Sequence, residues 1–297
     1  MTQPTLLIDG NNILIRAVEA TRRSAMHSDD GTDTSALVVF VKTLSRYIRQ
    51  YQPYRVSVLW DQTSTDVPNW RNRLYPPYKA NRPTAPDDYR RDSRFLAREF
   101  LDRAGIHQHA ILGMEADDLI GAYWRRETGP LAILSNDKDL LQLVGETPLG
   151  GDCHQVRVSS SDTPTDVWHH EDVEARYGCY PKNLPWVLAL AGDASDNIPG
   201  VPKIGPKFAV KHMGAAGWDI HKVEHPGIRA HIEEAHLFYQ LVNLRNPWEN
   251  SSSDLPTIPL FRPTSPGPDD AWLKLWTFLE SFQLRQFQRQ LLAGELW

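Results

Sequence analysis

The sequence contains little cysteine, no long apolar run and no excess of positive charge. Its 297 residues include only two cysteines, Cys153 and Cys179, too few for a disulfide framework, so we expect a protein of a reducing cytoplasm. No apolar stretch approaches the roughly 20 residues that a membrane-spanning helix needs, and the N-terminus lacks the pattern of a signal peptide. His169 and His170 lie beside acidic residues, but they lack the second ligand pair that a zinc site needs. We therefore expect neither membrane association nor a zinc centre.

The net charge of −5 is unusual for a protein that binds nucleic acid, but the acidic residues are unevenly distributed. Nine carboxylates end short apolar runs or form dense clusters, and without them the remaining charges sum to about +4, which is mildly basic. This balance permits a phosphate-binding surface around an acidic pocket. The nine are Asp9, Asp61, Glu115, Asp117, Asp118, Asp137, Asp139, Asp193 and Asp196.

Carboxylates gathered at close range repel one another and raise each other's pKa, so cations must neutralise such a group. Hard divalent ions that prefer oxygen ligands, Mg²⁺ or Mn²⁺, suit this role. Two such ions about 4 Å apart are the usual apparatus for hydrolysing phosphodiesters. The nine clustered carboxylates therefore predict a metal-dependent nuclease that uses two or more Mg²⁺ or Mn²⁺ ions.

Three short apolar runs predict buried strands, and each run is followed by an aspartate. The runs are 5–8, 56–59 and 131–134, and the aspartates are Asp9, Asp61 and Asp137. Apolar residues at helical spacing predict helices between and after them, over 34–51, 89–104, 114–126, 227–244 and 270–296. Strands separated by helices predict an α/β fold with a central, mostly parallel sheet flanked by helices. Ligands gather at the carboxyl ends of such strands, where these aspartates are expected.

The remaining acids come in pairs that are individually ordinary. Glu115 and Asp118 are three residues apart and share a helix face, whereas Asp117 is offset. They could simply complement the helix dipole. Alternation after the third strand would place Asp137 and Asp139 on one side, although this pair could also be a turn with a helix cap.

Asp193 and Asp196 are again expected on one helical face, with a capped helix end before Pro199 as the alternative. Four strand or helix ends that carry surplus acids together favour one shared site over four separate caps.

Residues 67–86 contain four basic residues, no acidic one, and interleaved aromatic side chains. Cations for phosphates and aromatic faces for bases are typical of a channel for single-stranded nucleic acid. The residues are Trp70, Arg71, Arg73, Tyr75, Tyr78, Lys79 and Arg82, of which Arg71, Arg73 and Tyr75 are expected DNA contacts. A solvated basic loop, with the tyrosines used in packing, is the alternative.

The run 198–207 has the composition of a hairpin that holds duplex DNA. Gly200 and Gly205 free the backbone for a tight turn and allow amide N–H groups to point at a phosphate, while Lys203 and Lys207 supply charge. A surface turn rich in Pro and Gly is the alternative. Carbonyl groups could instead face a monovalent cation, and those expected to do so belong to Asn197, Val201 and Ile204.

Six motifs, in this order and spacing, resemble the 5′-nuclease (flap endonuclease) superfamily in its bacterial and phage branch. That branch includes the 5′-3′ exonuclease domain of DNA polymerase I and the phage 5′-exonucleases. The motifs are LLIDGNN (6–12), WD (60–61), YKANR (78–82), EADD (115–118), NDKD (136–139) and GDASDNIPGVPKIGPK (192–207), and the resemblance covers roughly residues 5–292.

The resemblance implies a PIN-like nuclease core with a helical arch and a helical C-terminal region. The core is expected over 1–177 with the arch at about 69–98. The region 178–297 is expected to contain a helix-hairpin-helix motif at about 183–213, followed by helices that pack on the core. The usual Phe-Arg at the start of the arch is replaced by Trp70-Arg71, and Pro76-Pro77 precedes Tyr78, so the chain departs from the family's pattern here.

The resemblance also implies a role for each site residue. The first metal is held by Asp61, Glu115, Asp117 and Asp118, with Asp9 acting through water, and the second by Asp137, Asp139, Asp193 and Asp196. Lys79 and Arg82 are expected to contact the scissile phosphate, Tyr78 to stack on the unpaired terminal base, and the hairpin to bind duplex with K⁺.

The implied function is a structure-specific 5′ nuclease, a 5′-3′ exonuclease or flap endonuclease, that leaves 5′-phosphate and 3′-hydroxyl products during primer or flap removal. We expect a stand-alone monomer in a bacterial or phage-infected cell, acting on 5′ flaps, on nicked or gapped duplex and on RNA-primed ends. Two alternatives are a DNA-junction binder without turnover and an aspartyl-phosphate phosphatase. The latter chemistry needs an aspartate at position 11, where this chain has Asn11.

Overall fold

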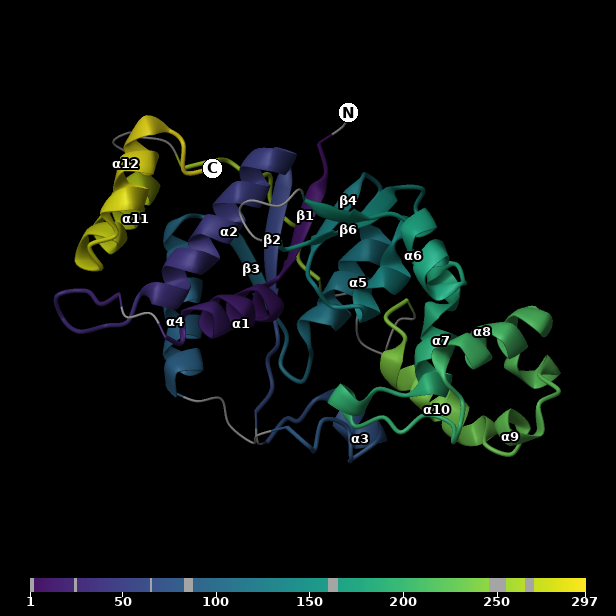
Figure 1. The fold of residues 1–297 in the computed structure, drawn as a ribbon. Coiled ribbons are helices and arrows are strands. Elements are labelled where there is room, and N and C mark those ends of the chain that lie inside the picture. The colour runs from purple at the N-terminus through teal and green to yellow at the C-terminus, as the bar shows by residue number, and fades with distance from the viewer. Residues whose placement is uncertain are drawn as a thin grey trace.

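The protein is built on a twisted, mostly parallel sheet (Figure 1). The computed structural model describes residues 3–23, 26–64, 66–82, 88–159, 165–245, 255–264 and 270–297. Within them, seven strands pair in the order β3-β2-β1-β4-β6-β5, and β7 pairs with β6. The strands are β1 Thr5–Asp9, β2 Arg55–Trp60, β3 His107–Ala110, β4 Leu131–Leu134, β5 Gly145–Glu146, β6 Asp152–Arg157 and β7 Asp166–Trp168.

Strand β1 lies at the centre of the sheet because its side chains are buried on both faces. It is parallel to β2 on one side and to β4 on the other, with Asp9 opposite Leu59 and Ile8 opposite Leu134. From β1 the chain adds β2 and β3 on one side and then returns to add β4 on the other, so the topological switch point lies between β1 and β4. In such sheets a crevice forms at the switch point, outside the carboxyl ends of the strands. Strand β6 continues the parallel sheet, and only β5 and β7 are antiparallel to it.

One face of the sheet is covered by helices of the N-terminal half, and the last two helices pack outside them (Figure 1). They are α1 Gly10–Thr21, α2 Ser35–Tyr51, α4 Asp88–Arg103, α11 Asp270–Ser281 and α12 Arg285–Ala293, whose apolar side chains form one buried cluster. Gly10 is required where α1 leaves β1, because a Cβ atom there would lie 2.7 Å from the Trp60 ring. The start of α1 can therefore approach β2 closely.

The opposite face is covered by α5 (Ala116–Arg126), the short helix η1 (Asp139–Leu143), and Leu255 and Ile258 from a later extended segment. The helices of the described residues are all too short or too polar to cross a membrane.

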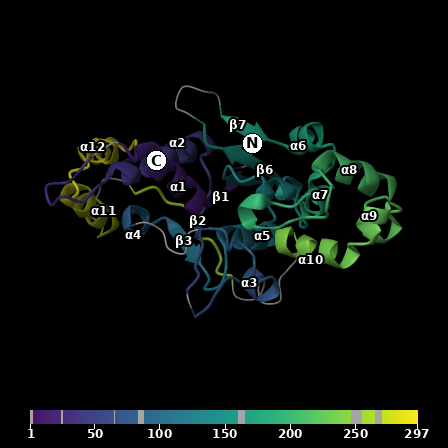
Figure 2. The same ribbon diagram turned by 60° about the horizontal axis from the view of Figure 1, so that its bottom comes forward.

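A third apolar cluster organises the helices that follow the sheet at one end of the molecule (Figures 1 and 2). The helices are α6 His170–Tyr177, α7 Leu184–Ala191, α8 Pro206–Ala215, α9 Pro226–Arg229 and α10 Ile232–Val242, with the short helices η2 Pro181–Asn183, η3 Ala194–Asp196 and η4 Ile220–Lys222 between them. The single helix expected over 227–244 is therefore two, α9 and α10. Helices α11 and α12 lie at the other end of the molecule.

The expected arch begins with α3 (Trp70–Leu74), continues through a turn to Arg82, and ends in α4. Its residues 83–87 lie outside the described part of the chain. The segment 192–205 connects α7 to α8, and its classification as a helix-hairpin-helix motif stays a prediction. Gly192 and Gly200 face each other at the base of this segment, where a Cβ on Gly200 would lie 2.5 Å from the Gly192 nitrogen.

Candidate active site

Three neighbouring strand ends deliver the first group of carboxylates. Asp9 accepts hydrogen bonds from the Asn12 amide and the Ser135 hydroxyl, both at 2.9 Å. Asp61, directly after β2, accepts the Ala116 amide at 2.7 Å. Asp137, three residues after β4, accepts the Asp139 amide at 2.9 Å. Burial raises the pKa of Asp9 to about 7, despite the hydrogen bond from Asn12, and the charges of Asp61 and Asp137 add to this increase.

Helix α5 begins at this edge of the sheet and adds Asp117. Burial raises the pKa of the Asp117 carboxyl well above its ordinary value, and repulsion from other carboxylates raises it further. These are, from the largest contribution, Asp137, Asp9, Glu115 and Asp61. Asp117 was expected to be offset from the other acids of its motif, but its charge interacts with those of all three strand-end aspartates.

A second group of carboxylates forms between η1 and the segment that connects α7 to α8. Burial raises the pKa of Asp139 to about 8, and the charges of Asp137, Asp193 and Asp196 raise it further, against the opposing effect of Lys138. The Asp139 Oδ1 atom is buried without a hydrogen-bond partner in the described structure. Asp137 interacts with both groups of carboxylates, so the two groups are continuous.

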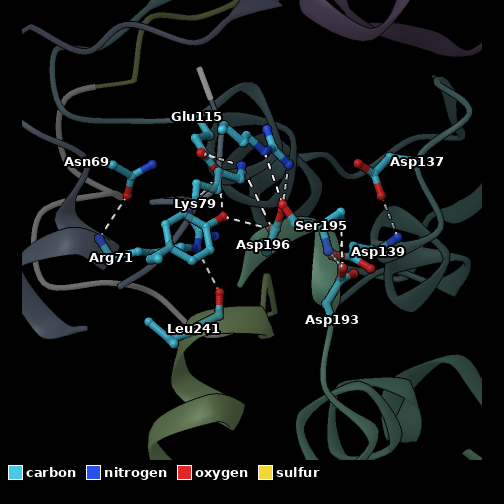
Figure 3. A network of polar contacts seen from close by, with 12 residues as sticks. Asn69, Arg71, Lys79, Glu115, Asp137, Asp139, Asp193, Ser195, Asp196 and Leu241 are labelled. Carbon is cyan, nitrogen blue, oxygen red and sulfur yellow. Dashed lines mark hydrogen bonds and ion pairs between the residues drawn. The ribbon is translucent and has the colours of Figure 1, made fainter. Parts of the chain in front are cut away.

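Cationic side chains from the beginning of the arch contact Glu115 and Asp196 (Figure 3). The Lys79 ammonium is 2.5 Å from Glu115 Oε1 and 3.9 Å from Asp196 Oδ2. Arg82 donates from Nη2 to Asp196 Oδ1 at 2.5 Å. The Lys79 amide also donates to the Asp196 carbonyl at 2.9 Å. The YKANR segment is therefore held against the segment that carries Asp193 and Asp196.

The donor set suits hard divalent cations. The carboxylates are buried or half-buried, several have raised pKa values, and the Asp139 oxygen lacks a partner, so a bound cation would relieve both repulsion and an unsatisfied group. Among the described residues, no group of three or more His, Cys, Asp or Glu side chains is placed so that it could hold a metal ion. Instead, Lys79 contacts Glu115, Lys138 contacts Asp193 and Arg82 contacts Asp196.

The structure corrects two expectations for the arch. Arg71 was expected at a DNA-binding surface, but it is only 2% exposed and its guanidinium contacts Asp118. Tyr78 was expected to stack on a terminal base, but it is 3% exposed and its hydroxyl lies 3.0 Å from Glu115 Oε2 and 3.1 Å from Asp196 Oδ2. Both side chains are covered because the arch begins against α5 and the helical region.

Further expected contacts divide into buried and accessible residues. Gly200 is buried against Gly192, so it does not offer an exposed amide to DNA. The Tyr75 ring packs edge-on against Phe238, with its centroid 6.0 Å away. Asp118 accepts hydrogen bonds from Arg71 at both of its oxygens. Arg73, Lys203, Gly205 and Lys207 are exposed.

Several site residues were missed by the sequence reasoning. Ser135 links the ends of β1 and β4 by donating to Asp9 and accepting the Asp137 amide. Lys138 pairs with Asp193 at 2.8 Å. Arg94 of α4 donates to the Asp61 carbonyl and lies over the Trp60 ring. Ser135 and Lys138 could have been found from the sequence, because both lie inside the acidic run SNDKD (135–139). No local pattern indicated Arg94.

Residues 4–178 match the family model described as the 5′-3′ exonuclease, N-terminal resolvase-like domain. The chain belongs to the 5′-3′ exonuclease family. A family member, the 5′-3′ exonuclease of Buchnera aphidicola, is 32% identical over 70% of this chain and 69% of its own length. The 5′-3′ exonuclease of Aquifex aeolicus is 32% identical over 80% of each chain. The family and nuclease function predicted from the motifs are thereby confirmed.

The fold is shared with the 5′-exonuclease of bacteriophage T5. A structure of that enzyme with bound zinc has a TM-score of 0.64 to this chain at 16% identity and covers 98% of this chain and 99% of its own. The T5 flap endonuclease in complex with DNA and metal ions has a TM-score of 0.62 at 16% identity, with the same coverage. The predicted α/β fold, with a mostly parallel central sheet flanked by helices, is confirmed.

Proposed function

We propose that this protein, a nuclease of the 5′-3′ exonuclease family, hydrolyses phosphodiesters where single-stranded DNA joins a duplex, using divalent metal ions. The observation that carries the proposal is the continuity of two buried carboxylate groups through Asp137, at the switch point of the sheet. Lys79 and Arg82 lie beside both groups, where a phosphate would enter. The metal-bound T5 relatives support divalent metal dependence, and Mg²⁺ or Mn²⁺ suits a site of carboxylate oxygens.

The carboxylates would hold two ions, one among Asp9, Asp61, Glu115 and Asp117, the other among Asp137, Asp139, Asp193 and Asp196. When bound, divalent ions lower the pKa of an attacking water and stabilise the leaving 3′ oxygen. Lys79 and Arg82 would neutralise the scissile phosphate and the charge that develops on it. Hydrolysis would leave a 5′-phosphate and a 3′-hydroxyl.

Exposed residues at α8 and on α3 are suited to the two parts of a junction substrate. Lys203, Gly205 and Lys207 lie at the exposed N-terminus of α8, where amide groups and charge favour duplex phosphates. Arg73 is exposed on α3, toward the arch, and is suited to the single strand. K⁺ at the carbonyls of Asn197, Val201 and Ile204 remains part of the proposal, as does the monomeric state.

A comparison of three 5′-end-labelled substrates tests the proposal: a 5′ flap, a nicked duplex and a blunt duplex, each with Mg²⁺, with Mn²⁺ and with EDTA. We expect metal-dependent cleavage of the flap and nick, with release of the intact flap oligonucleotide if the enzyme cuts endonucleolytically. Asp137→Asn should abolish cleavage and leave DNA binding unchanged.

Each alternative has its own outcome in this experiment. Tight junction binding without cleavage in any metal would identify a binding protein. Hydrolysis of a phosphomonoester without DNA cleavage would identify a phosphatase. Near-normal turnover by Asp137→Asn would contradict the assigned metal site.

A further inference from the structure

Arg71 makes several buried polar contacts beside the candidate active site, and Figure 3 shows it with Asn69, Glu115 and Leu241. Its Nη2 and Nη1 donate to Asp118 at 2.7 and 2.9 Å, and Nη1 also lies 3.4 Å from Glu115 Oε2. Its Nε donates to the Leu241 carbonyl at 2.7 Å. Its guanidinium carbon is 4.6 Å from the centre of the Trp70 ring. Every face of this guanidinium is therefore engaged within the protein.

Asp118 is correspondingly saturated. Besides the two bonds from Arg71, it accepts Trp70 Nε1 at 3.1 Å and the Glu115 amide at 3.1 Å, all at its two carboxylate oxygens. The Glu115 amide is the N-cap amide of α5, so Asp118 closes the first turn of that helix. A metal ion that displaced Arg71 from Asp118 would leave the buried guanidinium with only its longer contact to Glu115, at 3.4 Å, as a counterion.

We propose that Arg71 is a positioning residue for the nuclease, and that Asp118 is its counterion and not a metal ligand. Through Asp118, Arg71 holds the N-terminus of α5, and through Nη1 it restrains the Glu115 carboxylate. This inference rests on the proposed function, because it takes Glu115 as a ligand of the first metal. Charged and hydrogen-bonded groups behind a ligand fix its orientation and typically change metal affinity by about 10- to 100-fold when they are lost.

The contact with Leu241 adds a connection to the helical region. Leu241 lies in the last turn of α10, whose terminal carbonyls carry partial negative charge and accept from a cation. Arg71 itself lies on α3, at the start of the arch, where Asn69 accepts its amide at 2.8 Å. One guanidinium thus joins the arch, the metal-binding end of α5 and the helical region that carries Lys203 and Lys207.

Arg71→Lys separates positioning from simple charge compensation. A lysine keeps the charge beside Asp118, but it cannot form the forked bonds to Asp118 and reach Glu115 and Leu241 as well. A double variant, Arg71→Gln with Asp118→Asn, removes both buried charges and retains side chains that can hydrogen-bond. Arg103→Gln is the matched control, because Arg103 forms a 3.0 Å surface pair with Glu99 on α4, away from these contacts.

Three measurements are made on each variant: the Mg²⁺ concentration for half-maximal flap cleavage, the thermal stabilisation that Mg²⁺ gives without DNA, and flap affinity in Ca²⁺. For Arg71→Lys and for the double variant we expect a Mg²⁺ midpoint raised about tenfold or more. The Mg²⁺-induced rise in Tm should shrink in parallel, and DNA affinity should stay within about twofold, while Arg103→Gln matches wild type in all three. The Tm of the double variant should exceed that of Arg71→Gln alone, because no unpaired charge remains.

Three results would overturn the inference. A wild-type Mg²⁺ midpoint in the double variant would show that Arg71 and Asp118 form an ion pair that stabilises the fold without affecting metal binding. A large loss of DNA affinity in Arg71→Lys would make Arg71 a DNA contact. A Mg²⁺-induced rise in Tm reduced as much by Asp118→Asn as by Asp117→Asn, with the Tm of Asp118→Asn in EDTA unchanged from wild type, would make Asp118 a ligand. If wild type cleaves no substrate, the proposed function fails, whereas thermal stabilisation by Mg²⁺ still reports on Arg71.

Discussion

The Lys138 ammonium lies 2.8 Å from Asp193 Oδ2 and joins the loop after β4 to the segment between α7 and α8. Asp193 also accepts the Ser195 amide at 2.8 Å and its hydroxyl at 2.6 Å through Oδ1. Burial alone would raise the pKa of Asp193, but Lys138 and Ser195 hold it below its ordinary value. The Asp193 carboxylate therefore connects the helical region, which carries it, to the loop that follows strand β4 of the sheet.

Replacing Lys138 by Met should slow flap cleavage about tenfold or more with little loss of stability. The pair is half exposed on the lysine side, so its contribution to stability is small, whereas the Asp193 carboxylate loses one of its two anchors. Cleavage rates and Tm measure the two effects. Lys222→Met removes a similar pair with Asp219, at 3.3 Å and far more exposed, and should change neither. Equal losses of activity in both variants would contradict this role of Lys138.

Asp117→Asn should stabilise the protein in EDTA at pH 8 and abolish cleavage. Asp117 is buried among carboxylates that raise its pKa, so a neutral amide removes repulsion from the folded state. We expect a Tm a few degrees above wild type in EDTA, and a smaller further rise when Mg²⁺ is added. Glu146→Gln, an exposed position at the end of β5, is the control and should leave Tm and cleavage unchanged. Retention of most activity by Asp117→Asn would remove it from the metal site.

The stability of the protein in EDTA should decrease as the pH rises from about 4 to about 8. Burial raises the pKa of Asp9 to about 7 and that of Asp139 to about 8, from an ordinary value of 3.8. Between these limits the unfolded chain has released protons that the folded protein still binds, so the free energy of unfolding falls. Urea unfolding at several pH values measures this trend.

Mg²⁺ should reverse this trend, because the ionised carboxylates become its ligands. Stabilisation by Mg²⁺ is expected to increase with pH over the same window. A free energy of unfolding that rises with pH in EDTA would contradict the burial of these two acids.

Tyr78→Phe tests whether the hydroxyl or the ring of Tyr78 matters. The single hydroxyl proton is shared between Glu115 and Asp196, which belong to different carboxylate groups. Its loss should destabilise the protein by about 1.5–3 kcal/mol, since hydrogen bonds to charged groups are the stronger ones. Urea unfolding and flap affinity in Ca²⁺ distinguish the two roles. Unchanged stability in Tyr78→Phe, together with weakened flap binding in Tyr78→Leu alone, would restore the stacking role.

The elements that carry the first aspartates could be predicted because their signals are local. A short apolar run followed by an acid identifies a buried strand and its end, and the run at 131–134 coincides with β4. Strand β3 was missed because its residues, His107 to Ala110, are only partly buried at the edge of the sheet and carry no apolar pattern. Helices α9 and α10 were merged because no strong breaker separates them in sequence.

The direction of each acidic side chain could not be predicted. Helical spacing paired Glu115 with Asp118, but Asp118 turns to Arg71 and closes the first turn of α5. Spacing along a helix predicts which residues share a face, but it does not predict which other segment of the protein packs against that face. The same limit applies to Tyr78 and Arg71, whose aromatic and cationic character suggested nucleic acid.

The amino-acid sequence by itself determined that this protein concentrates carboxylates at strand and helix ends, and that it belongs to a nuclease family. Those properties depend on residue type and spacing within short motifs. The tertiary structure decided which acids meet and which cations are buried, because the partners are far apart in the chain: Tyr78 and Asp196 by 118 residues, Arg71 and Leu241 by 170. Contacts over such separations depend on how the sheet and the helical region pack, which no local pattern specifies.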